Sequence, residues 1–480
     1  MSHPQVIPLV SIDNPALENG YCVGCGVCSI ATDSQIQMRL DEYGRYKPYA
    51  TASLSSPISS NIAQKVCPFS DTSRNEDEIS SIHYKYPEKT HKKLGRFEQV
   101  IVGHAEEGNF RGAGSSGGLT NWILHELLAS NQIDAVIGVG KSESADKLFE
   151  YKIIESAAEI SLLSKSKYYP VELSKVLQKA LASDNKTYAI VGTPCFIKAT
   201  RNLCLEHPEF AKKIKYFVAI VCGHLKSTGF AESLAWQVDV LPHQLTTFDF
   251  RVKQENKPAN RYAIRATGHS DNIEIQGQAP VFDLYGTDWG LGYFKLKGCD
   301  YCDDIAGETA DITLGDAWLP ADIQNYQGTN IAVVRSKHLL KIIESAKDRA
   351  AISYRLATAD DFIISQAANY RHRHDGLSYR LFLADKQSEW RPKKRIEASD
   401  TSLDAKRKKV IELRTILMEK SHIAFKEAKA QKRFSKFKRA LNKDFILYYY
   451  YSGSLLKIIA KTLIIKWRRV LHLTKIKSYC

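Results

Sequence analysis

Three closely spaced cysteines near the N-terminus constrain the fold more than any other feature. The stretch YCVGCGVCSI places Cys22, Cys25 and Cys28 at two-residue gaps, in a chain with ten cysteines among 480 residues. Such gaps let neighbouring thiolates turn inward from one loop, and the intervening glycines permit the tight backbone that this requires. The first residues lack a basic segment followed by a long apolar core, so we expect a cytoplasmic chain with reduced thiols. Clustered cysteines in that compartment indicate metal ligands or redox groups.

The triplet needs a fourth ligand. Bacterial-type ferredoxins continue with a nearby Cys-Pro, whereas here Cys67-Pro68 follows Cys28 by 39 positions. One triplet with one distant Cys-Pro predicts a single [4Fe–4S] cluster held by Cys22, Cys25, Cys28 and Cys67, in a small ferredoxin-like domain over residues 1–80. The alternative is structural zinc in a four-cysteine site, although zinc sites more often use two paired C-x2-C knuckles.

A second set of cysteines is dispersed. Cys195 and Cys222 each end a strand-like run, KTYAIVGTPC and YFVAIVCG, and Cys299 and Cys302 form a C-x2-C pair. Four thiolates are enough for a second cubane cluster. The alternative makes Cys195 and Cys222 small buried apolar residues and assigns the pair to a redox or zinc knuckle.

The chain between the cysteine-rich start and residue 390 indicates a mixed α/β domain. Residues 71–95 are polar and are interpreted as a linker. QVIVGHA and IDAVIGVG are expected to be strands flanking the helical run LTNWILHELLAS, and TTFDFRV, ADITLGDAW and NIAVVRS are further strand candidates. In α/β sheets, ligands gather beyond the carboxyl ends of strands.

A glycine-rich loop precedes the predicted helix. Gly112-Ala-Gly114-Ser-Ser-Gly117 fits G-x-G-x-x-G, and backbone N–H groups at a helix start attract phosphate. No acidic residue stands at the end of the second strand, so a nicotinamide dinucleotide is not favoured. The nearby stretch SKSKYYP adds Lys165, Lys167 and Tyr168, which would suit a flavin nucleotide. The alternative is a glycine turn that binds nothing.

Taken in order, GSSGGLTNWILHELL, SKSKYYP, VGTPC, VCGH, CDYCDD and ADITLGDAW resemble the coenzyme F-420 hydrogenase/dehydrogenase beta-subunit family over residues 15–390. That family is related to 7-hydroxymethyl chlorophyll a reductase and has members associated with bacterial exopolysaccharide synthesis. The resemblance implies an FAD and one or two [4Fe–4S] clusters, with Cys195, Cys222, Cys299 and Cys302 binding the second. Asp311, Gly315 and Asp316 match a family segment expected to be structural.

The resemblance also implies an oxidoreductase that passes electrons from a ferredoxin-type donor through the clusters to a flavin and an organic substrate. The expected flavin site comprises Gly114, Ser115, Ser116, Gly117, Gly118, Thr120, Lys167, Tyr168 and Thr193. A proton donor is also needed, and of His104, His125 and His224 the last is the best candidate because it follows Cys222. The alternatives are an electron-transfer subunit without its own substrate, a chlorophyll-type or deazaflavin reductase, and a binding protein with a structural metal.

The basic charge of the chain lies in its last part. Residues 401–480 hold 21 Lys and Arg against 5 Asp and Glu, whereas the rest is nearly neutral. Residues 400–480 therefore form a basic, amphipathic helical tail, expected either to touch the inner face of the cell membrane through residues 430–475 or to pack on the body or a partner. Nucleic acid is disfavoured because a phosphate-binding helix would not need so many aliphatic residues. No run is long enough to span a bilayer. The expected fold is α/β (α+β overall): iron–sulfur domain, flavin domain over residues 96–390, and tail.

Overall fold

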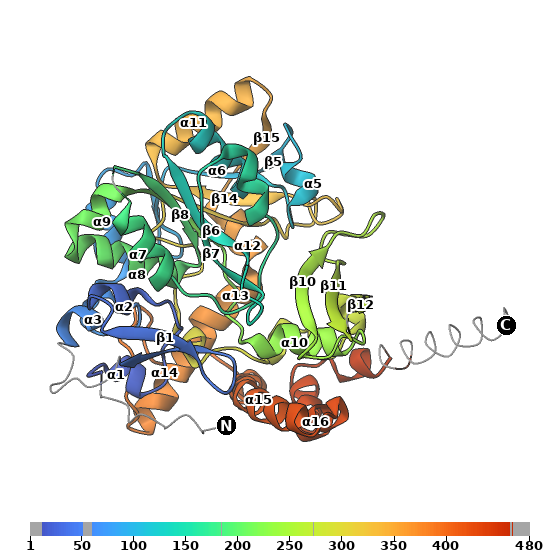
Figure 1. Ribbon diagram of the computed structural model, residues 1–480. Helices are drawn as coiled ribbons and strands as arrows, with labels where there is room; N and C mark the ends of the chain where they lie inside the picture. Colours follow the sequence, from blue (N-terminus) through green and yellow to red (C-terminus); the bar gives the residue numbers. More distant parts are fainter. Residues whose placement is uncertain (1–11, 51–59, 184, 272, 461–462, 464–480) are drawn as a thin grey trace, which may run out of the picture.

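The computed structural model describes residues 12–50, 60–183, 185–271, 273–460 and 463, and an eight-stranded mixed sheet forms its centre (Figure 1). The strand order is β15-β5-β14-β13-β9-β8-β6-β7, in which β13, β9, β8 and β6 pair in parallel and the other pairs are antiparallel. The mixed α/β fold is therefore confirmed. The strands are β5 (Gln99–Ala105), β6 (Ala135–Lys141), β7 (Phe149–Ile154), β8 (Tyr188–Gly192), β9 (Ile214–Ile220), β13 (Ile312–Asp316), β14 (Asn330–Val334) and β15 (Ile352–Ala357).

Both faces of this sheet are buried. In β8, Ala189 points to one face while Tyr188 and Ile190 point to the other, as the two-residue repeat of a strand requires. The first face packs against α6 (Leu119–Ala129) and α11 (Lys337–Asp348). The second packs against the cysteine-rich N-terminal segment and other helices, namely α7 (Ser174–Ala182), α8 (Pro194–Glu206), α9 (Pro208–Lys213) and α12 (Ala359–Ser365). Where side chains on both faces are covered, as in β8 and β14, the strand is apolar nearly throughout, whereas the edge strand β15 carries Arg355 and an exposed Leu356.

A separate three-stranded antiparallel sheet lies beside the main sheet (Figure 1). It consists of β10 (Leu245–Val252), β11 (Ala263–Ser270) and β12 (Ile273–Pro280), with α10 (Thr228–Trp236) at its base. Its aromatic side chains Phe248 and Phe250 join a core shared with α10 and the C-terminal helices. Single 3-10 turns follow at Val281–Asp283, Trp289–Leu291 and Lys297–Tyr301.

The N-terminal segment packs directly on the central domain. It consists of α1 (Pro15–Glu18), α2 (Val27–Ala31), the hairpin β1 (Ile36–Leu40) and β2 (Tyr46–Ala50), and α3 (Ser60–Val66). Val27 and Val66 are fully buried in the same core as Phe196 and Ile197 of α8. The cysteine-rich part of the sequence therefore shares its hydrophobic core with the main sheet.

Residues 71–95 are not a linker, contrary to the expectation from their polarity. They form α4 (Glu76–His83), with a capping box between Asn75 and Glu78, and the first strand of the hairpin β3 (Lys89–His91) and β4 (Gly95–Phe97). Glu76 is buried and pairs with Lys198 of α8 at 3.1 Å. The polar residues of α4 face charged partners distant in sequence, which composition alone does not reveal.

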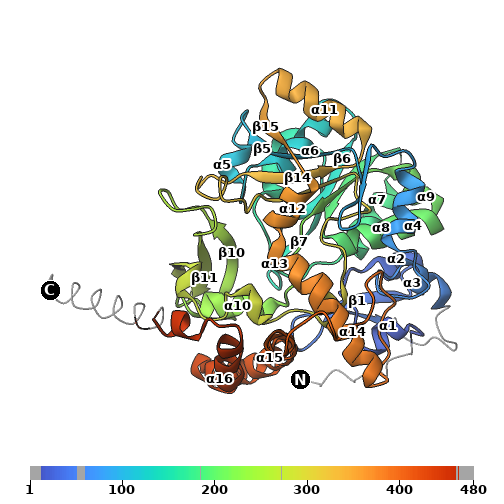
Figure 2. The same ribbon diagram turned by 180° about the vertical axis from the view of Figure 1, so that it is seen from behind.

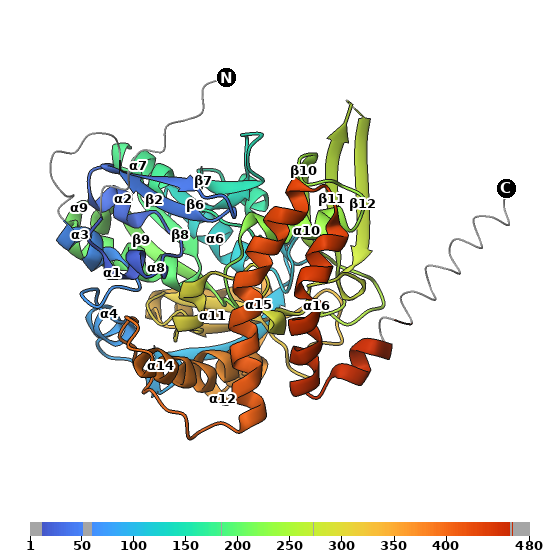
Figure 3. The same cartoon turned by 90° about the horizontal axis from the view of Figure 1, so that it is seen from below.

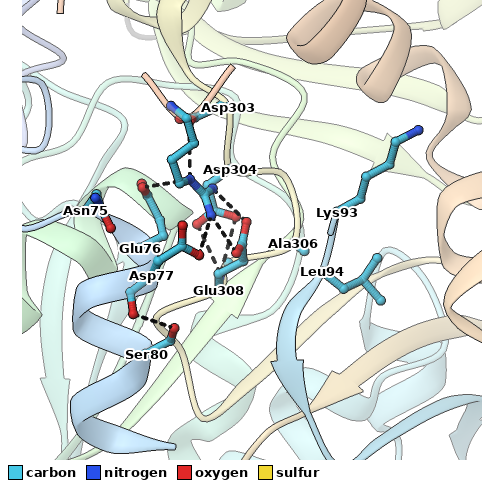
Figure 4. A network of polar contacts seen from close by, with 12 residues as sticks. Asn75, Glu76, Asp77, Ser80, Lys93, Leu94, Asp303, Asp304, Ala306 and Glu308 are labelled. Carbon is cyan, nitrogen blue, oxygen red and sulfur yellow. Dashed lines mark hydrogen bonds and ion pairs between the residues drawn. The ribbon is translucent and has the colours of Figure 1, made fainter. Parts of the chain in front are cut away.

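A connector after α14 returns the chain to that polar network. α13 (Ala367–Tyr370), a π-helical turn over Arg371–Asp375 and α14 (Gly376–Lys386) run along the back of the molecule (Figure 2). In the connector, residues 390–396, Arg395 binds Glu308 through two hydrogen bonds of 2.8 Å. Glu76, Asp303 and Glu308 converge there (Figure 4). The connector thus joins α4 to the loop after Cys302.

The C-terminal residues form two antiparallel helices, α15 (Ala405–Ala430) and α16 (Phe434–Tyr451), which lie side by side (Figure 3). Leu417, Phe425, Phe437 and Leu441 are buried with Phe294 of the central domain. This helical hairpin therefore packs on the body of the protein, which is one of the two alternatives expected for the tail. Within the described part of the chain, no helix is both long and apolar enough to cross a bilayer. Residues 464–475 of the expected membrane segment lie outside the described residues.

Candidate functional site

The N-terminal cysteines come from two short segments that meet. Cys22 and Cys25 lie in the loop before α2, Cys28 lies in its first turn, and Cys67 directly follows α3. Burial raises the pKa of the Cys25 thiol well above its usual value, and the neighbouring thiols of Cys28, Cys67 and Cys22 raise it further. The structure therefore brings the four predicted ligands together. Crowded, buried thiols are a donor set suited to a bound metal, which favours their thiolate form.

Two glycines shape the loop that carries the triplet. Gly24 and Gly26 have φ angles of +73° and +80°. A Cβ at Gly24 would lie 2.8 Å from the Cβ and carbonyl oxygen of Tyr46, and one at Gly26 would lie 2.6 Å from the Glu172 Oε2. The spacing of the triplet thus depends on positions that accept only glycine without strain.

The second set of cysteines lines one small, largely enclosed cavity. Cys195 and Cys222 follow the carboxyl ends of β8 and β9, and Cys299 and Cys302 come from the 3-10 turn at 297–301 and the residue after it. The backbone N–H of Leu225 donates to the Cys299 Sγ at 3.3 Å. The dispersed residues therefore converge on one site, as strand-end ligands of adjacent parallel strands should.

The two cysteine groups share a wall. Val23, between Cys22 and Cys25 in the sequence, and Phe69, just after Cys67, both line the cavity of the second group. The second group also approaches the first, since a Cβ at Gly298 would lie 2.3 Å from the Tyr21 carbonyl oxygen. Residues adjacent to the first set of ligands thus form part of the second site.

Buried charged side chains surround the second cavity. Arg373 lines it, with Nη1 3.1 Å from the Cys302 Sγ and 3.0 Å from the Asp304 carbonyl oxygen. Lys226 is buried nearby, and burial, followed by the charge of Lys295, lowers its pKa well below the usual value. Carboxylates lie there as well, and Asp300 pairs with Lys295. Burial raises the pKa of the Cys302 thiol to about 11, Arg373 and Lys394 lower it, and Asp303 and Asp304 raise it. The second cysteine group therefore lies among buried charges of both signs.

Neither cysteine group has the geometry of a single-ion site. Within the described residues, no three His, Cys, Asp or Glu side chains are placed to hold one metal ion. Zinc requires its donors around one ion at roughly 2.3 Å, whereas each thiolate of a [4Fe–4S] cluster binds a different iron.

The glycine loop, residues 114–118, connects α5 (Phe110–Ala113) to α6. The Ser115 Oγ accepts a hydrogen bond from the Ser166 N–H at 2.9 Å, and the Ser116 Oγ donates to the Thr329 carbonyl at 2.9 Å. Gly118 has a φ of +82°, and a Cβ at Gly117 would lie 2.8 Å from the Asn330 backbone nitrogen. The loop thus meets the 164–168 segment, as the flavin prediction requires, although both serine hydroxyls already have protein partners. Thr120 lies in the first turn of α6.

The other predicted flavin residues lie in different environments. The Lys167 Nζ donates to the carbonyls of Leu163 and Ser164, both at 2.6 Å, and burial lowers its pKa to about 7. Thr193 caps α8 beside Cys195, with its Oγ1 3.5 Å from the sulfur. Lys167 is therefore held by its own loop, while Thr193 belongs beside the second cysteine group.

Tyr168 and His224 meet at Trp289. Their rings lie 4.9 Å and 4.4 Å from the Trp289 ring, measured between centroids. The His224 ring is buried, its Nε2 has no hydrogen-bond partner among the described residues, and burial followed by the charge of Lys226 lowers its pKa. This aromatic contact links the predicted flavin segment to the residue that follows the second cysteine group. His104 instead pairs with Glu106, and His125 packs on Phe110.

Sequence reasoning missed several residues that the fold brings to these sites. Trp289 and Arg373 are two of them, and the π-helical turn of Arg373 has no distinctive sequence signal. Lys253, directly after β10, is a third: its Nζ donates to the Ser116 carbonyl of the glycine loop at 3.1 Å. The alternating cations Arg251, near the end of β10, and Lys253 were the available signal. Arg251 pairs with Asp316 at 2.7 Å.

Asp311, expected to be structural, is buried at the centre of a hydrogen-bond network. It accepts hydrogen bonds from the Tyr84 hydroxyl, the Arg201 guanidinium and the Phe217 N–H at 2.7–3.1 Å.

Comparisons with known proteins identify the domain that carries these residues. Residues 100–178 match the family model described as coenzyme F420 hydrogenase/dehydrogenase, beta subunit N-term, and residues 185–359 match the corresponding C terminus. No curated protein matches the sequence. A chain of the F420-reducing [NiFe] hydrogenase complex from Methanosarcina barkeri, studied by xenon derivatization, is 13% identical, with a TM-score of 0.46 over 62% of this chain and 96% of that chain. Since the two family models together match more than half of the residues, the chain belongs to the coenzyme F420 hydrogenase/dehydrogenase beta subunit family, a family of redox proteins.

Proposed function

We propose that this chain is an iron–sulfur flavoprotein that transfers electrons between a ferredoxin-type donor and an organic substrate. The observation that carries the proposal is the wall formed by Val23 and Phe69, through which the two four-cysteine groups adjoin. Two groups that shared no wall would be explained equally well as unrelated structural sites. Adjacent groups favour electron transfer, since transfer requires neighbouring redox centres.

Cys22, Cys25, Cys28 and Cys67 would hold one [4Fe–4S] cluster, and Cys195, Cys222, Cys299 and Cys302 would hold the second. When bound, such clusters exchange single electrons, and a flavin can join one-electron steps to a two-electron step. The protein itself supplies burial, which excludes water from the thiols. Arg373 supplies a charged hydrogen-bond donor at Cys302.

The flavin is proposed to lie at the glycine loop. Gly114, Ser115, Ser116, Gly117 and Gly118 precede α6 and Thr120 lies in its first turn, where backbone N–H groups at a helix start favour phosphate. The Leu119 N–H already donates to the Asn330 Oδ1, so the phosphate would be held by the other N–H groups of this turn. Tyr168 and Trp289 provide apolar ring faces that lead toward His224. His224 is the proposed proton-handling group, since its Nε2 is free of protein partners among the described residues.

Metal and flavin content test the proposal directly. The chain is purified without oxygen, and iron, acid-labile sulfide and FAD are measured with the absorption spectrum. We expect about eight irons and one flavin, from two four-iron clusters. Replacing Cys25 by Ser or Cys299 by Ser should each remove about half of the iron.

Cys204→Ser is the matched control, because this buried thiol of α8 belongs to neither group. A colourless protein, or iron loss in the Cys204 variant equal to that in the others, would contradict the proposal.

The description of the family as a beta subunit favours a second candidate, an electron-transfer subunit without its own substrate. Anaerobic reoxidation of the reduced protein separates the two. An enzyme is reoxidised by a small organic compound: a deazaflavin, a chlorin or a precursor in exopolysaccharide synthesis. A subunit transfers its electrons only to a protein partner.

A further inference from the structure

One face of α16 is exposed along its whole length, and its first half is basic whereas its second half is apolar. Lys436, Arg439, Lys443, Ile446 and Tyr450 follow one another at alternating spacings of three and four residues, which places them on a single face of the helix. The opposite face is buried against the body through Phe437, Leu441 and Tyr448. The exposed face therefore has a fixed orientation in the folded protein.

The first half of this face is basic and unpaired. Within the described residues, Lys436, Arg439 and Lys443 form no ion pair. The one acidic residue of α16, Asp444, is buried and is paired with Lys420 at 2.7 Å. Nothing acidic on α16 itself therefore offsets the positive field of the face.

The second half is apolar. Tyr450 is 62% exposed and Ile446 is 43% exposed. Beyond the turn at Gly453, the short helical segment at residues 455–460 exposes two further apolar side chains, Leu456, which is 82% exposed, and Ile459. Exposed aliphatic and aromatic side chains next to lysines and arginines are typical of a surface that lies at the membrane interface.

We propose that this face of α16, with Leu456 and Ile459, docks the folded protein on an anionic lipid bilayer. Lys436, Arg439 and Lys443 would meet the headgroups, and Ile446, Tyr450 and Leu456 would enter the boundary between headgroups and acyl chains. A second copy of the chain fits this face poorly, because its own three cations would face the same three cations. α16 lies at the end of the molecule opposite α11, so the central domain does not obstruct a flat surface there (Figure 1).

The experiment measures binding of the full chain to vesicles by cosedimentation. One set of vesicles contains equal parts of phosphatidylglycerol and phosphatidylcholine, and the other contains phosphatidylcholine alone. We expect binding to the first set only, weakened by salt. Each cation near such a surface contributes about a fivefold factor, so K436Q, R439Q and K443Q together should weaken binding about a hundredfold.

The matched control changes three exposed lysines of α11, K337Q, K341Q and K347Q, with the same loss of charge at the far end of the molecule. Binding by the control should equal that of the original chain. A second variant, I446S with Y450S and L456S, should also lose binding while keeping the same net charge. Equal binding to both vesicle types, equal losses in the α11 control, or self-association through this face in place of lipid binding would each overturn the proposal.

Discussion

Arg373 donates a hydrogen bond from Nη1 to the Cys302 Sγ across 3.1 Å, from a fully buried position in a π-helical turn. Beside a cysteine of the proposed second cluster, this positive charge would stabilise the reduced, more negative state. We therefore expect Arg373→Gln to make reduction of the second cluster at least tenfold less favourable, a decrease of about 59 mV for a one-electron couple. Redox titration followed by electron paramagnetic resonance measures this shift.

Arg391→Gln is the control for that titration, since Arg391 lies near the surface and pairs with Asp385. Its potential should match that of the unmodified protein. An unchanged potential in the Arg373 variant at full iron content would show that this contact does not tune the cluster.

The glycines of the triplet loop can be tested by adding one methyl group. Gly24→Ala combines an unfavourable φ of +73° with a Cβ only 2.8 Å from Tyr46 atoms, so we expect it to reduce the free energy of unfolding by about 3 kcal/mol. Gly453→Ala has a similar φ of +68° but nothing within 4 Å, and should cost about 1 kcal/mol or less. Urea unfolding compares the two variants. Equal costs would mean that the Tyr46 contact relaxes without penalty.

Arg395 and Arg391 lie near one another in the sequence, and the first forms a buried ion pair while the second forms an exposed one. Arg395 binds Glu308, whose side chain is 4% exposed, whereas Arg391 binds Asp385, whose side chain is 46% exposed. Arg395→Gln leaves a buried carboxylate unpaired and should cost about 3 kcal/mol, against less than about 1 kcal/mol for Arg391→Gln. Thermal unfolding measures both. Adding Glu308→Gln to the Arg395 variant should recover part of the loss, and a further decrease would argue against the buried pair as its source.

His422 makes the docking of α15 sensitive to pH. Its Nε2 lies 3.0 Å from the Lys295 carbonyl oxygen and its Nδ1 lies 3.3 Å from the Ser227 Oγ, an arrangement that suits a neutral ring donating from Nε2. Burial lowers the pKa of His422 to about 4; the Lys295 carbonyl and Asp41 raise it, and Arg45 and Lys226 lower it.

Because an unfolded histidine has a pKa of about 6.5, the unfolded chain takes up a proton first as the pH falls. The contribution of the neutral His422 ring to the free energy of unfolding is complete above pH 6.5. It is lost between about pH 6.5 and pH 4, by at most about 3 kcal/mol. Denaturation curves at several pH values should therefore show a shallower acid decline for His422→Gln than for the original chain. Parallel declines would mean that His422 is already protonated in the folded state.

The strands and the grouping of the cysteines were the parts most accessible from sequence. β8 and β9 are short apolar runs that end shortly before Cys195 and Cys222, so both their type and the edge at which they meet follow from pattern and topology. The helix after the glycine loop was predictable for the same reason, since its apolar spacing is regular. These are features that neighbouring residues determine.

Features that depend on distant partners were not predictable. α4 looked like a linker because its buried Glu76 is compensated by Lys198 and Arg395, hundreds of positions away in the latter case. Lys167 looked like a phosphate ligand, yet its Nζ is engaged by two carbonyls of its own loop. Arg373 lies in RHRHD, which has the composition of a solvent-exposed segment. In each case the tertiary environment, and not the local pattern, decides where the charge lies.

The connector at residues 390–396 has a consequence for biosynthesis. Trp390 packs on Tyr21, and Lys394 lies over the ring of Phe69, so a late part of the chain closes over the wall between the two cysteine groups. Synthesis proceeds from the N-terminus, and all eight cysteines of the two groups leave the ribosome before this closure can form. Under the proposed function, iron and sulfide would reach these cysteines in a nascent, open chain, before the connector covers the wall between the two groups.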